Sequence, residues 1–294
     1  MSHALHIVDV FAERRYTGNP LAVVVGQQAL SDDTMLAIAA EMNYSETTFV
    51  SPVRERDGGH PIRIFTPARE IAFAGHPILG TASVLRRHLA LDASAMLHLN
   101  TAVGQVPVTF EDANDGTSTA WFRAPAVTLG PTCARERMAA ALGLWPDDIA
   151  ADAPVQRLSA GTSAMIVPLR GLRALKRSML DLQAYASLAE EGFPPLVYLF
   201  CRETHDPGSD LCARFFFEAH GVREDPATGN GAAFLGAYLL EHRYLFEPDF
   251  DLRIEQGHEV RRPSRILLRG RQVDGAPVVS VGGSVVATVR GELA

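Results

Sequence analysis

The chain has 294 residues, of which 47% are apolar and 21% charged, so it is long enough for about two globular domains with their own cores. The 27 basic and 34 acidic residues give a net charge of -7, which argues against a nucleic-acid partner. The three cysteines form no Cys-x-x-Cys pair, and no apolar stretch reaches the roughly 20 residues of a membrane span. We therefore expect a cytoplasmic chain with no disulfide framework and no membrane partner.

The first part of the chain alternates strand signals with two helix signals. Strands are predicted at Ile7–Phe11, Leu21–Val25, Thr47–Val50 and Ile62–Thr66, and a hairpin at Gly104–Phe110 and Thr119–Phe122 around Asp115-Gly116. A helix from Ser31 to Met42 begins with a serine N-cap and two aspartates. A second helix, Ile78–Leu89, is apolar on every face until its last turn, which is typical of a buried helix.

The second part begins with a candidate linker at Ala124–Thr132, rich in proline and small residues. Later helices are predicted at Arg135–Leu144, Met179–Glu190 and Ala232–Leu240, and strands at Ser163–Leu169, Leu196–Phe200 and Phe215–Phe217. From Phe250 onward, the glycine and proline punctuation predicts a series of short strands.

An approximate internal repeat links the two parts. Gly75-His76-Pro77 and Gly229-Asn230-Gly231 each open an apolar helix that contains another glycine, Gly80 in one and Gly236 in the other. The repeat predicts two similar α/β halves, each with a helix wrapped by strands. A chance similarity between two ordinary glycine-containing helix caps is the alternative.

These helix starts are the first candidate binding positions. The N-terminus of a helix presents N–H groups without partners and the positive end of the helix dipole, so it attracts a carboxylate or a phosphate.

Three titratable side chains are further candidates for a site. Glu46 directly precedes a predicted strand, and burial in an apolar cleft would make it a plausible general base. A solvent-facing glutamate, or a capping partner of Asn43, is the alternative. His76 is either a titratable cleft residue or a capping residue, and Asp225 is either a second cleft carboxylate or a turn residue before Pro226.

Other kinds of site are disfavoured. The chain contains no Gly-x-Ser-x-Gly, His-Glu-x-x-His or P-loop motif. Its ten histidines show no metal-ligand spacing, so we predict no metal site. Lys176 is the only lysine, which argues against a Schiff-base cofactor.

The motifs in this order resemble the PhzF-like family, named for phenazine biosynthesis, over nearly the whole chain. The resemblance rests on Val8–Phe11 with Gly18–Val23, Ser45–Phe49, Phe65–Pro67, Phe73–Pro77 with Gly80–Ala82, Glu224–Gly229, and Gln256-Gly257 with Arg262–Ser264.

This resemblance implies the diaminopimelate-epimerase-like fold, an α/β (α+β) architecture of two pseudo-symmetric halves. Each half is a curved, barrel-like, mostly antiparallel sheet around a central helix. We expect the halves at residues 1–127 and 128–294, with the last strand able to pack back on the first half. The family implies cofactor-independent isomerases that act on small carboxylate substrates in the interdomain cleft and are commonly homodimers.

The resemblance also assigns roles. It makes Glu46 the general acid/base, and it makes His76 and Asp225 the residues that orient the substrate. The substrate-binding positions that it implies are Asn19, Gly75, Thr228, Gly229 and Asn230, the last of which is serine in many relatives.

Related racemases use two cysteines at the helix starts. Cys133, Cys201 and Cys212 lie elsewhere, so a two-thiol racemase is disfavoured. The alternatives left open are an epimerase or dehydratase on the same scaffold, and a non-catalytic member that binds a small ligand or another protein.

Overall fold

The computed structural model describes residues 3–28, 30–92, 96–114, 116–217, 224–245 and 248–293. The chain divides into two compact units, with residues 1–123 and 282–294 in unit 1 and residues 124–281 in unit 2. The boundary predicted from the sequence lies after residue 127, whereas the structure assigns residues 124–127 to unit 2. Among the described residues, no helix combines the length and the apolar character needed to cross a bilayer.

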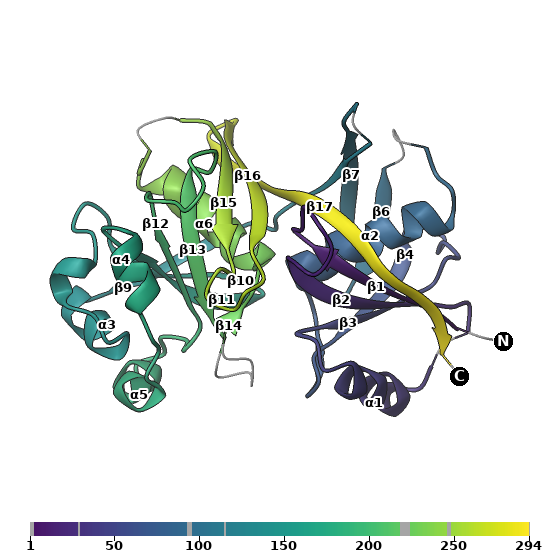
Figure 1. The fold of residues 1–294 in the computed structure, drawn as a ribbon, viewed down its shortest axis with the longest axis horizontal. Helices are drawn as coiled ribbons and strands as arrows, with labels where there is room; N and C mark the ends of the chain where they lie inside the picture. The colour runs from purple at the N-terminus through teal and green to yellow at the C-terminus, as the bar shows by residue number, and fades with distance from the viewer. Residues whose placement is uncertain are drawn as a thin grey trace. The chain divides into compact units, whose positions relative to one another are not determined.

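Unit 1 is built on a sheet that closes on itself. Its strands are β1 (His3–Val10), β2 (Asn19–Val25), β3 (Thr47–Val50), β4 (His60–Phe65), β5 (Glu70–Ile71), β6 (Leu97–Thr101), β7 (Gly104–Asp112), β8 (Ser118–Arg123) and the C-terminal part of β17 (Ala276–Leu293). They pair in the order β1-β2-β3-β4-β6-β7-β8-β17, and β17 returns to β1, as Figure 1 shows at the C-terminus. The β2–β3 and β4–β6 pairs are parallel.

The helix α2 (Gly75–His88) forms the core of this barrel. It contacts β1, β2, β3, β6, β7 and β8, and its residues from Gly75 to Leu85 are all buried, as predicted for an apolar helix. A Cβ on Gly80 would come within 2.5 Å of Leu21 Cδ2, so the glycine lets the helix approach β2 closely. The helix begins earlier than predicted because Pro77 is tolerated in the first turn.

The helix α1 (Asp32–Met42) packs on the outside of the same sheet. Ser31 caps it by accepting the Thr34 N–H, as the sequence predicts. Its buried face joins Met35 and Ala39 to Phe49 and Phe65 of the sheet.

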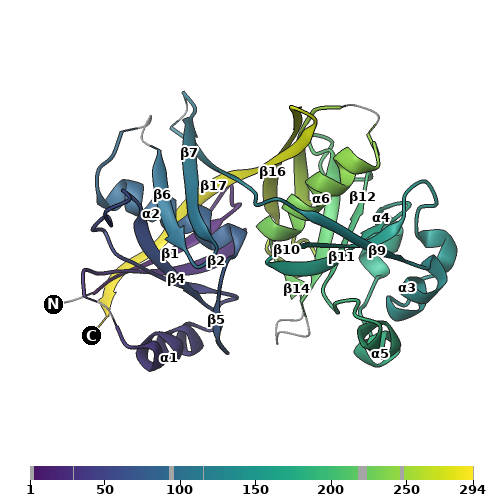
Figure 2. The same ribbon diagram turned by 180° about the vertical axis from the view of Figure 1, so that it is seen from behind.

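Unit 2 has its own curved sheet and central helix (Figure 2). Its strands are β9 (Thr128–Cys133), β10 (Val155–Ala160), β11 (Thr162–Pro168), β12 (Val197–Cys201), β13 (Leu211–Phe216), β14 (Glu224–Asp225), β15 (Phe250–Gln256), β16 (Ser264–Val273) and the N-terminal part of β17. Its helices are α3 (Arg135–Ala141), the 3-10 turn η1 (Pro146–Asp148), α4 (Leu172–Arg177), α5 (Leu182–Glu190) and α6 (Gly229–Glu241). The helix α6 packs against β10, β11 and β16, and a Cβ on Gly236 would come within 2.6 Å of Val279 Cγ1.

The two units repeat one topology. The successive pairs of β1-β2-β3-β4-β6-β7 are antiparallel, parallel, antiparallel, parallel and antiparallel, and the pairs of β10-β11-β12-β13-β15-β16 follow the same series. A two-residue strand, β5 or β14, precedes the central helix in each unit. The internal repeat predicted from the helix starts is therefore confirmed.

Three local predictions need correction. The predicted linker is wrong from Thr128 onward, because β9 pairs with β10; a register shift opposite Pro131 accommodates the missing N–H. The helix α3 ends at Ala141, before Gly143 with its φ of +63°. The helix α5 starts at Leu182, later than predicted, because Asp181 caps it. Asp115 of the predicted hairpin turn lies outside the described residues.

Candidate functional site

The start of α2 is buried and lacks a side-chain cap. Ala74 is its N-cap residue and makes no side-chain hydrogen bond to the first turn. Gly75 and His76 are its first two residues, and the whole His76 residue is only 3% exposed. The N-cap residue of α2 therefore supplies no side-chain acceptor to the N–H groups of the first turn.

A carboxylate and an amide flank His76. His76 Nε2 lies 3.4 Å from Glu46 Oε2, and its Nδ1 lies 3.3 Å from Asn19 Nδ2. Glu46 is 6% exposed and Asn19 is fully buried, although both are polar. Three predicted site residues from distant parts of the sequence thus meet at one helix start.

The protonation of His76 follows from its surroundings. Burial lowers the pKa of His76 to about 3, so the imidazole is neutral near pH 7. The Asn19 amide nitrogen can only donate, so Nδ1 accepts and the single ring proton is on Nε2. Nε2 lies 3.4 Å from Glu46 Oε2 but makes no hydrogen bond to it, so a neutral imidazole stands beside the proposed base.

Local backbone structure fixes this group. Gly18 has a φ of +70°, and a Cβ there would come within 2.3 Å of the Val10 carbonyl oxygen, so only glycine fits before Asn19. The hydroxyl groups of Thr48 and Thr81, 2.8 Å apart, tie β3 to α2 just beyond Glu46.

The start of α6 in unit 2 carries a different cluster. Its N-cap residue, Thr228, donates its hydroxyl to Asp225 Oδ2 at 2.6 Å instead of accepting from the helix. Gln256 at the end of β15 donates to the Asp225 carbonyl oxygen at 2.9 Å and accepts the Thr228 N–H at 3.2 Å. Asp225, Thr228 and Gln256 are all buried, and this hydrogen bonding fixes the loop that leads into the helix.

The predicted binding positions around α6 lie at its first residues. Gly229 is buried and Asn230 is half-buried, and Asn230 Oδ1 has no hydrogen-bond partner among the described residues. The structure thus brings Asp225, Thr228, Gly229 and Asn230 together in unit 2, and Asn19, Glu46, Gly75 and His76 together in unit 1. The three cysteines are buried on β9, β12 and β13, away from both helix starts.

Tyr198 is a further candidate site residue that the sequence reasoning missed. The register pairs Tyr198 with Phe215 and Phe215 with Asp225, which places all three side chains on one face of neighbouring strands. Tyr198 packs on the first turn of α6, where a Cβ on Gly231 would come within 2.3 Å of its ring. Its fully buried hydroxyl has no hydrogen-bond partner among the described residues, and burial raises its pKa.

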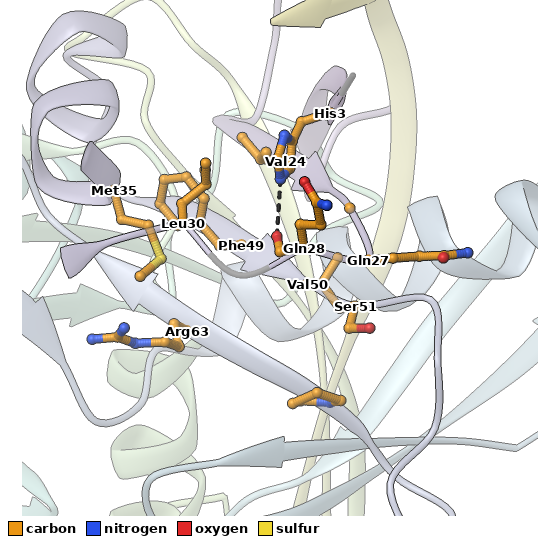
Figure 3. A pocket seen from close by; sticks show the side chains of 12 residues that line it. His3, Val24, Gln27, Gln28, Leu30, Met35, Phe49, Val50, Ser51 and Arg63 are labelled. Atoms are coloured by element: carbon orange, nitrogen blue, oxygen red, sulfur yellow. Dashed lines mark hydrogen bonds between the residues drawn. The ribbon is translucent and has the colours of Figure 1, made fainter. Parts of the chain in front are cut away.

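A separate pocket of about 310 Å³ lies on the outer face of unit 1 (Figure 3). Val24, Phe49 and Arg63 of the sheet line it together with Met35 of α1, and His3 Nε2 contacts the Gln28 carbonyl oxygen at 3.0 Å beside it. None of the residues at the two helix starts lines this pocket.

Comparisons with known proteins match this architecture. The family model described as phenazine biosynthesis-like protein matches residues 8–291. A solved PhzF-family phenazine biosynthesis protein of Bacillus anthracis superposes with a TM-score of 0.89 at 25% identity and covers 100% of this chain and 99% of its own. A probable proline racemase of Agrobacterium radiobacter, 13% identical with a TM-score of 0.62, shares the fold.

Relatives named as isomerases are similar over nearly their full lengths. A trans-2,3-dihydro-3-hydroxyanthranilate isomerase of Pseudomonas aeruginosa is 34% identical, with 98% of both chains covered. An uncharacterized isomerase of Mesorhizobium japonicum is 35% identical, with 98% of this chain and 97% of the relative covered. The chain therefore belongs to the phenazine biosynthesis-like family and is an isomerase of the PhzF type.

Proposed function

We propose that this isomerase shifts a proton within a small carboxylic or amino-carboxylic acid, without a cofactor, by general acid/base catalysis at Glu46. The observation that carries the proposal is the buried Glu46 carboxylate, 3.4 Å from neutral His76 at the buried start of α2. A carboxylate held in this way is placed for proton transfer rather than for solvation.

The reaction needs one base. Glu46 removes a proton from a carbon that a neighbouring π-system or carbonyl makes acidic, and returns it to another carbon on the same face. Racemisation through opposite faces usually needs two bases, which fits the absence of cysteines from the helix starts. Positioned acid/base groups of this kind are worth about 10²–10⁴-fold in rate.

The remaining site residues would bind and orient the substrate. The N–H groups at the starts of α2 and α6 suit a substrate carboxylate, because helix N-termini favour negative charge. Asp225, held by Thr228, suits an amino or hydroxyl group of the substrate. We propose that the active protein is a homodimer, which sedimentation equilibrium would test.

The test follows hydrogen exchange in deuterated water by NMR. The first probe is trans-2,3-dihydro-3-hydroxyanthranilate, because a relative at 34% identity is named for isomerising it; a panel of small amino and hydroxy acids follows. The wild-type protein should move one C–H hydrogen, and Glu46→Gln should lose this activity while remaining folded. The matched control is Glu41→Gln, which changes an exposed glutamate of α1.

Each outcome separates the alternatives. Equal exchange in wild type and Glu46→Gln would remove Glu46 from the mechanism. Inverted configuration or loss of water in the product would indicate an epimerase or a dehydratase on the same scaffold. A substrate that binds and is recovered unchanged would indicate a ligand-binding member of the family.

A further inference from the structure

A basic pocket of about 230 Å³ lies in unit 1, at the end of α2 that is farther from the candidate site. It is bounded by the last turn of α2 and by the strands β1 and β17. Four basic side chains line it: His6 of β1, Arg15 of the loop after β1, Arg87 of α2 and Arg290 of β17. Because α2 has 14 residues, about 20 Å separates this end from His76 at its start.

Strand pairing brings these side chains to one place. His6 is directly opposite Arg290 in the antiparallel pair of β1 and β17, so both side chains are on the same face of the sheet. Val8 is on that face too, and it lies against α2, because a Cβ on Gly80 would come within 3.4 Å of Val8 Cγ2. The basic pocket is therefore on the inner face of the barrel, where the last turn of α2 adds Arg87.

The arginines of the basic pocket lack an anionic partner. In the parts of the chain that the structure describes, no ion pair contains Arg15, Arg87 or Arg290. By contrast Arg86, the neighbour of Arg87 in α2, pairs with Asp112 at 2.6 Å. The last turn of α2 thus carries one arginine with a carboxylate partner and one without.

Most N–H donors of these arginines are not used by the protein. Nε of Arg15 donates to the Ala287 carbonyl oxygen at 3.2 Å. Arg87 donates to two carbonyl oxygens, those of Ser83 and Val285, at 3.1 and 3.3 Å. A guanidinium has five N–H donors, so the remaining ones are available to water or to a ligand.

The positive charges of the basic pocket also repel one another. Burial lowers the pKa of His6, as do the charges that face it from neighbouring elements, which are Arg290, His88 and Arg87. Partial loss of hydration and the charges of Arg290 and Arg86 lower the pKa of Arg87. A bound anion would offset this repulsion, and among the described residues no aspartate or glutamate lines the pocket to do so.

The surroundings of the basic pocket include acidic groups and a second hollow. Glu292 follows Arg290 by two residues on the same face of β17, and Glu13 lines an adjoining pocket of about 940 Å³. Neither glutamate lines the basic pocket. The adjoining pocket shares Arg15 and Arg87 with the basic pocket, so a ligand held by these two side chains has room to extend into it.

We propose that the basic pocket binds the diphosphate group of a small soluble ligand through Arg15, Arg87 and Arg290. Guanidinium groups bind phosphate oxygens through parallel N–H donors, and three of them match the charge of a diphosphate. The negative end of the α2 dipole opposes the anion with the equivalent of only about half an elementary charge. At about 230 Å³, the pocket is smaller than the roughly 300–1,000 Å³ of drug-sized ligand sites, which suits one such group.

This site would act apart from the isomerisation. The proton transfer proposed for Glu46 needs no diphosphate, and the two sites are at opposite ends of α2. The ligand would join β1, β17 and the last turn of α2, and would therefore stabilise the folded form of unit 1.

The test uses the whole chain with inorganic pyrophosphate as the probe, at low salt and without divalent metal ions. Pyrophosphate at about 100 times its Kd should raise the Tm by roughly 5 °C, and added NaCl should weaken binding by screening the charges. The pKa of His6, followed by NMR of its ring protons, should rise on binding, because a nearby negative charge favours the imidazolium form. His60, which lines neither pocket, is the internal reference.

Variants locate the bound anion. Arg87→Gln and Arg290→Gln should each weaken pyrophosphate binding by at least about tenfold, as expected for the loss of charged hydrogen bonds. Arg290 makes no side-chain hydrogen bond to the described residues, so Arg290→Gln tests binding without disturbing the fold. The matched control is Arg54→Gln, which removes an exposed arginine of unit 1 that lines neither pocket. Glu46→Gln should leave the response of His6 unchanged, so this test and the test of the proposed function fail independently.

A comparison of pyrophosphate with ADP identifies the source of the diphosphate. Tighter binding of ADP would indicate a ligand whose organic part occupies the adjoining pocket, and equal or weaker binding would indicate the inorganic ion.

Two results would overturn the proposal. The first is an unchanged pKa of His6 at millimolar pyrophosphate. The second is equal affinity in wild type, Arg87→Gln and Arg290→Gln, or an equal loss in Arg54→Gln, either of which would reduce the binding to a general attraction of anions by exposed positive charge.

Discussion

The start of α2 in unit 1 and the start of α6 in unit 2 follow equivalent two-residue strands but carry different side chains. At α2, a neutral histidine lies beside a buried glutamate, and the N-cap residue, Ala74, makes no side-chain hydrogen bond. At α6, the aspartate is held by a threonine and a glutamine in a hydrogen-bonded loop. The same position in the two copies of the fold thus holds a buried histidine–glutamate pair in unit 1 and a hydrogen-bonded loop in unit 2.

Both units also contain an equivalent Arg–Glu pair on the two strands that precede the central helix. Arg63 of β4 contacts Glu70 of β5 and lies over Phe65, and Arg214 of β13 contacts Glu224 of β14 and lies over Phe216. The side chains of the first pair are 36% and 42% exposed, and those of the second pair are 7% and 5% exposed. The equivalent Arg–Glu pair is therefore partly exposed to solvent in unit 1 and almost fully buried in unit 2.

The largest expected effect distinguishes the two helix starts by kinetics. Glu46→Gln should lower kcat by about 10²–10⁴-fold, because it removes the acid/base group. Asp225→Asn should act mainly on KM, since it keeps the shape and the hydrogen bond from Thr228 but removes the charge. Steady-state kinetics with the substrate found by the exchange assay would check this. A loss of kcat with unchanged KM in Asp225→Asn would place proton transfer in unit 2 as well.

The next prediction concerns the repeated Arg–Glu pair. Glu224→Ala should lower the free energy of unfolding by about 3–5 kcal/mol, because it leaves the Arg214 guanidinium buried without its main anionic partner. Glu70→Ala should lower it by about 0–1 kcal/mol, because water replaces the lost contact. Urea unfolding of both variants measures the contrast. Equal losses would show that the difference in burial does not govern these two pairs.

A smaller effect is expected from the buried histidine of unit 1. The unfolded chain binds a proton at His76 below about pH 6.5, whereas the folded chain does so only near pH 3, so unfolding takes up a proton between these values. Stability therefore falls as the pH decreases through this window, by about 2 kcal/mol between pH 7 and pH 5 from this residue.

Unfolding curves at pH 7 and pH 5 test this, with His76→Asn expected to lose less stability on acidification than the wild type. The matched control is His60→Asn. His60 is equally buried and its pKa is also lowered by burial, but its hydrogen bond to the Ser51 carbonyl oxygen opposes that shift. An identical pH dependence of stability in His76→Asn and wild type would mean that the pKa of His76 is the same in the folded and the unfolded chain, so that burial does not lower it.

Sequence and structure agree where a signal is local. The apolar helices after Gly75 and Gly229 were predictable because glycine-containing turns and all-apolar faces lie in short stretches. His76 and Asp225 could be named because they stand in the short motifs at those turns. Glu46 could be named because it stands in the Ser45–Phe49 motif, on which the resemblance to the PhzF-like family partly rests. Their roles in catalysis stay predictions, since they depend on the substrate.

The missed features depend on strand pairing. Tyr198 shares a face of the sheet with Asp225 only because β12, β13 and β14 are neighbours in register, and nothing around Tyr198 in the sequence indicates this. A group of two histidines and one glutamate in unit 2 is spread in the same way: His205 lies 50 residues from Glu255 and packs beside His258. Spacing along the chain therefore predicted no metal site, although side chains with ligand-like separations meet across the sheet.

Tyr198 gives the smallest expected change in stability and a direct test of the site in unit 2. Tyr198→Phe should change the free energy of unfolding by less than about 0.5 kcal/mol, because the hydroxyl has no partner among the described residues and the ring keeps its packing on α6. The same variant should raise KM, because a buried hydroxyl on the face of Asp225 is placed to contact the substrate. Urea unfolding and steady-state kinetics measure the two effects. A large loss of stability with unchanged KM would assign the hydroxyl to the folded core, and the proposed binding surface in unit 2 would then be limited to the first turn of α6 and its loop.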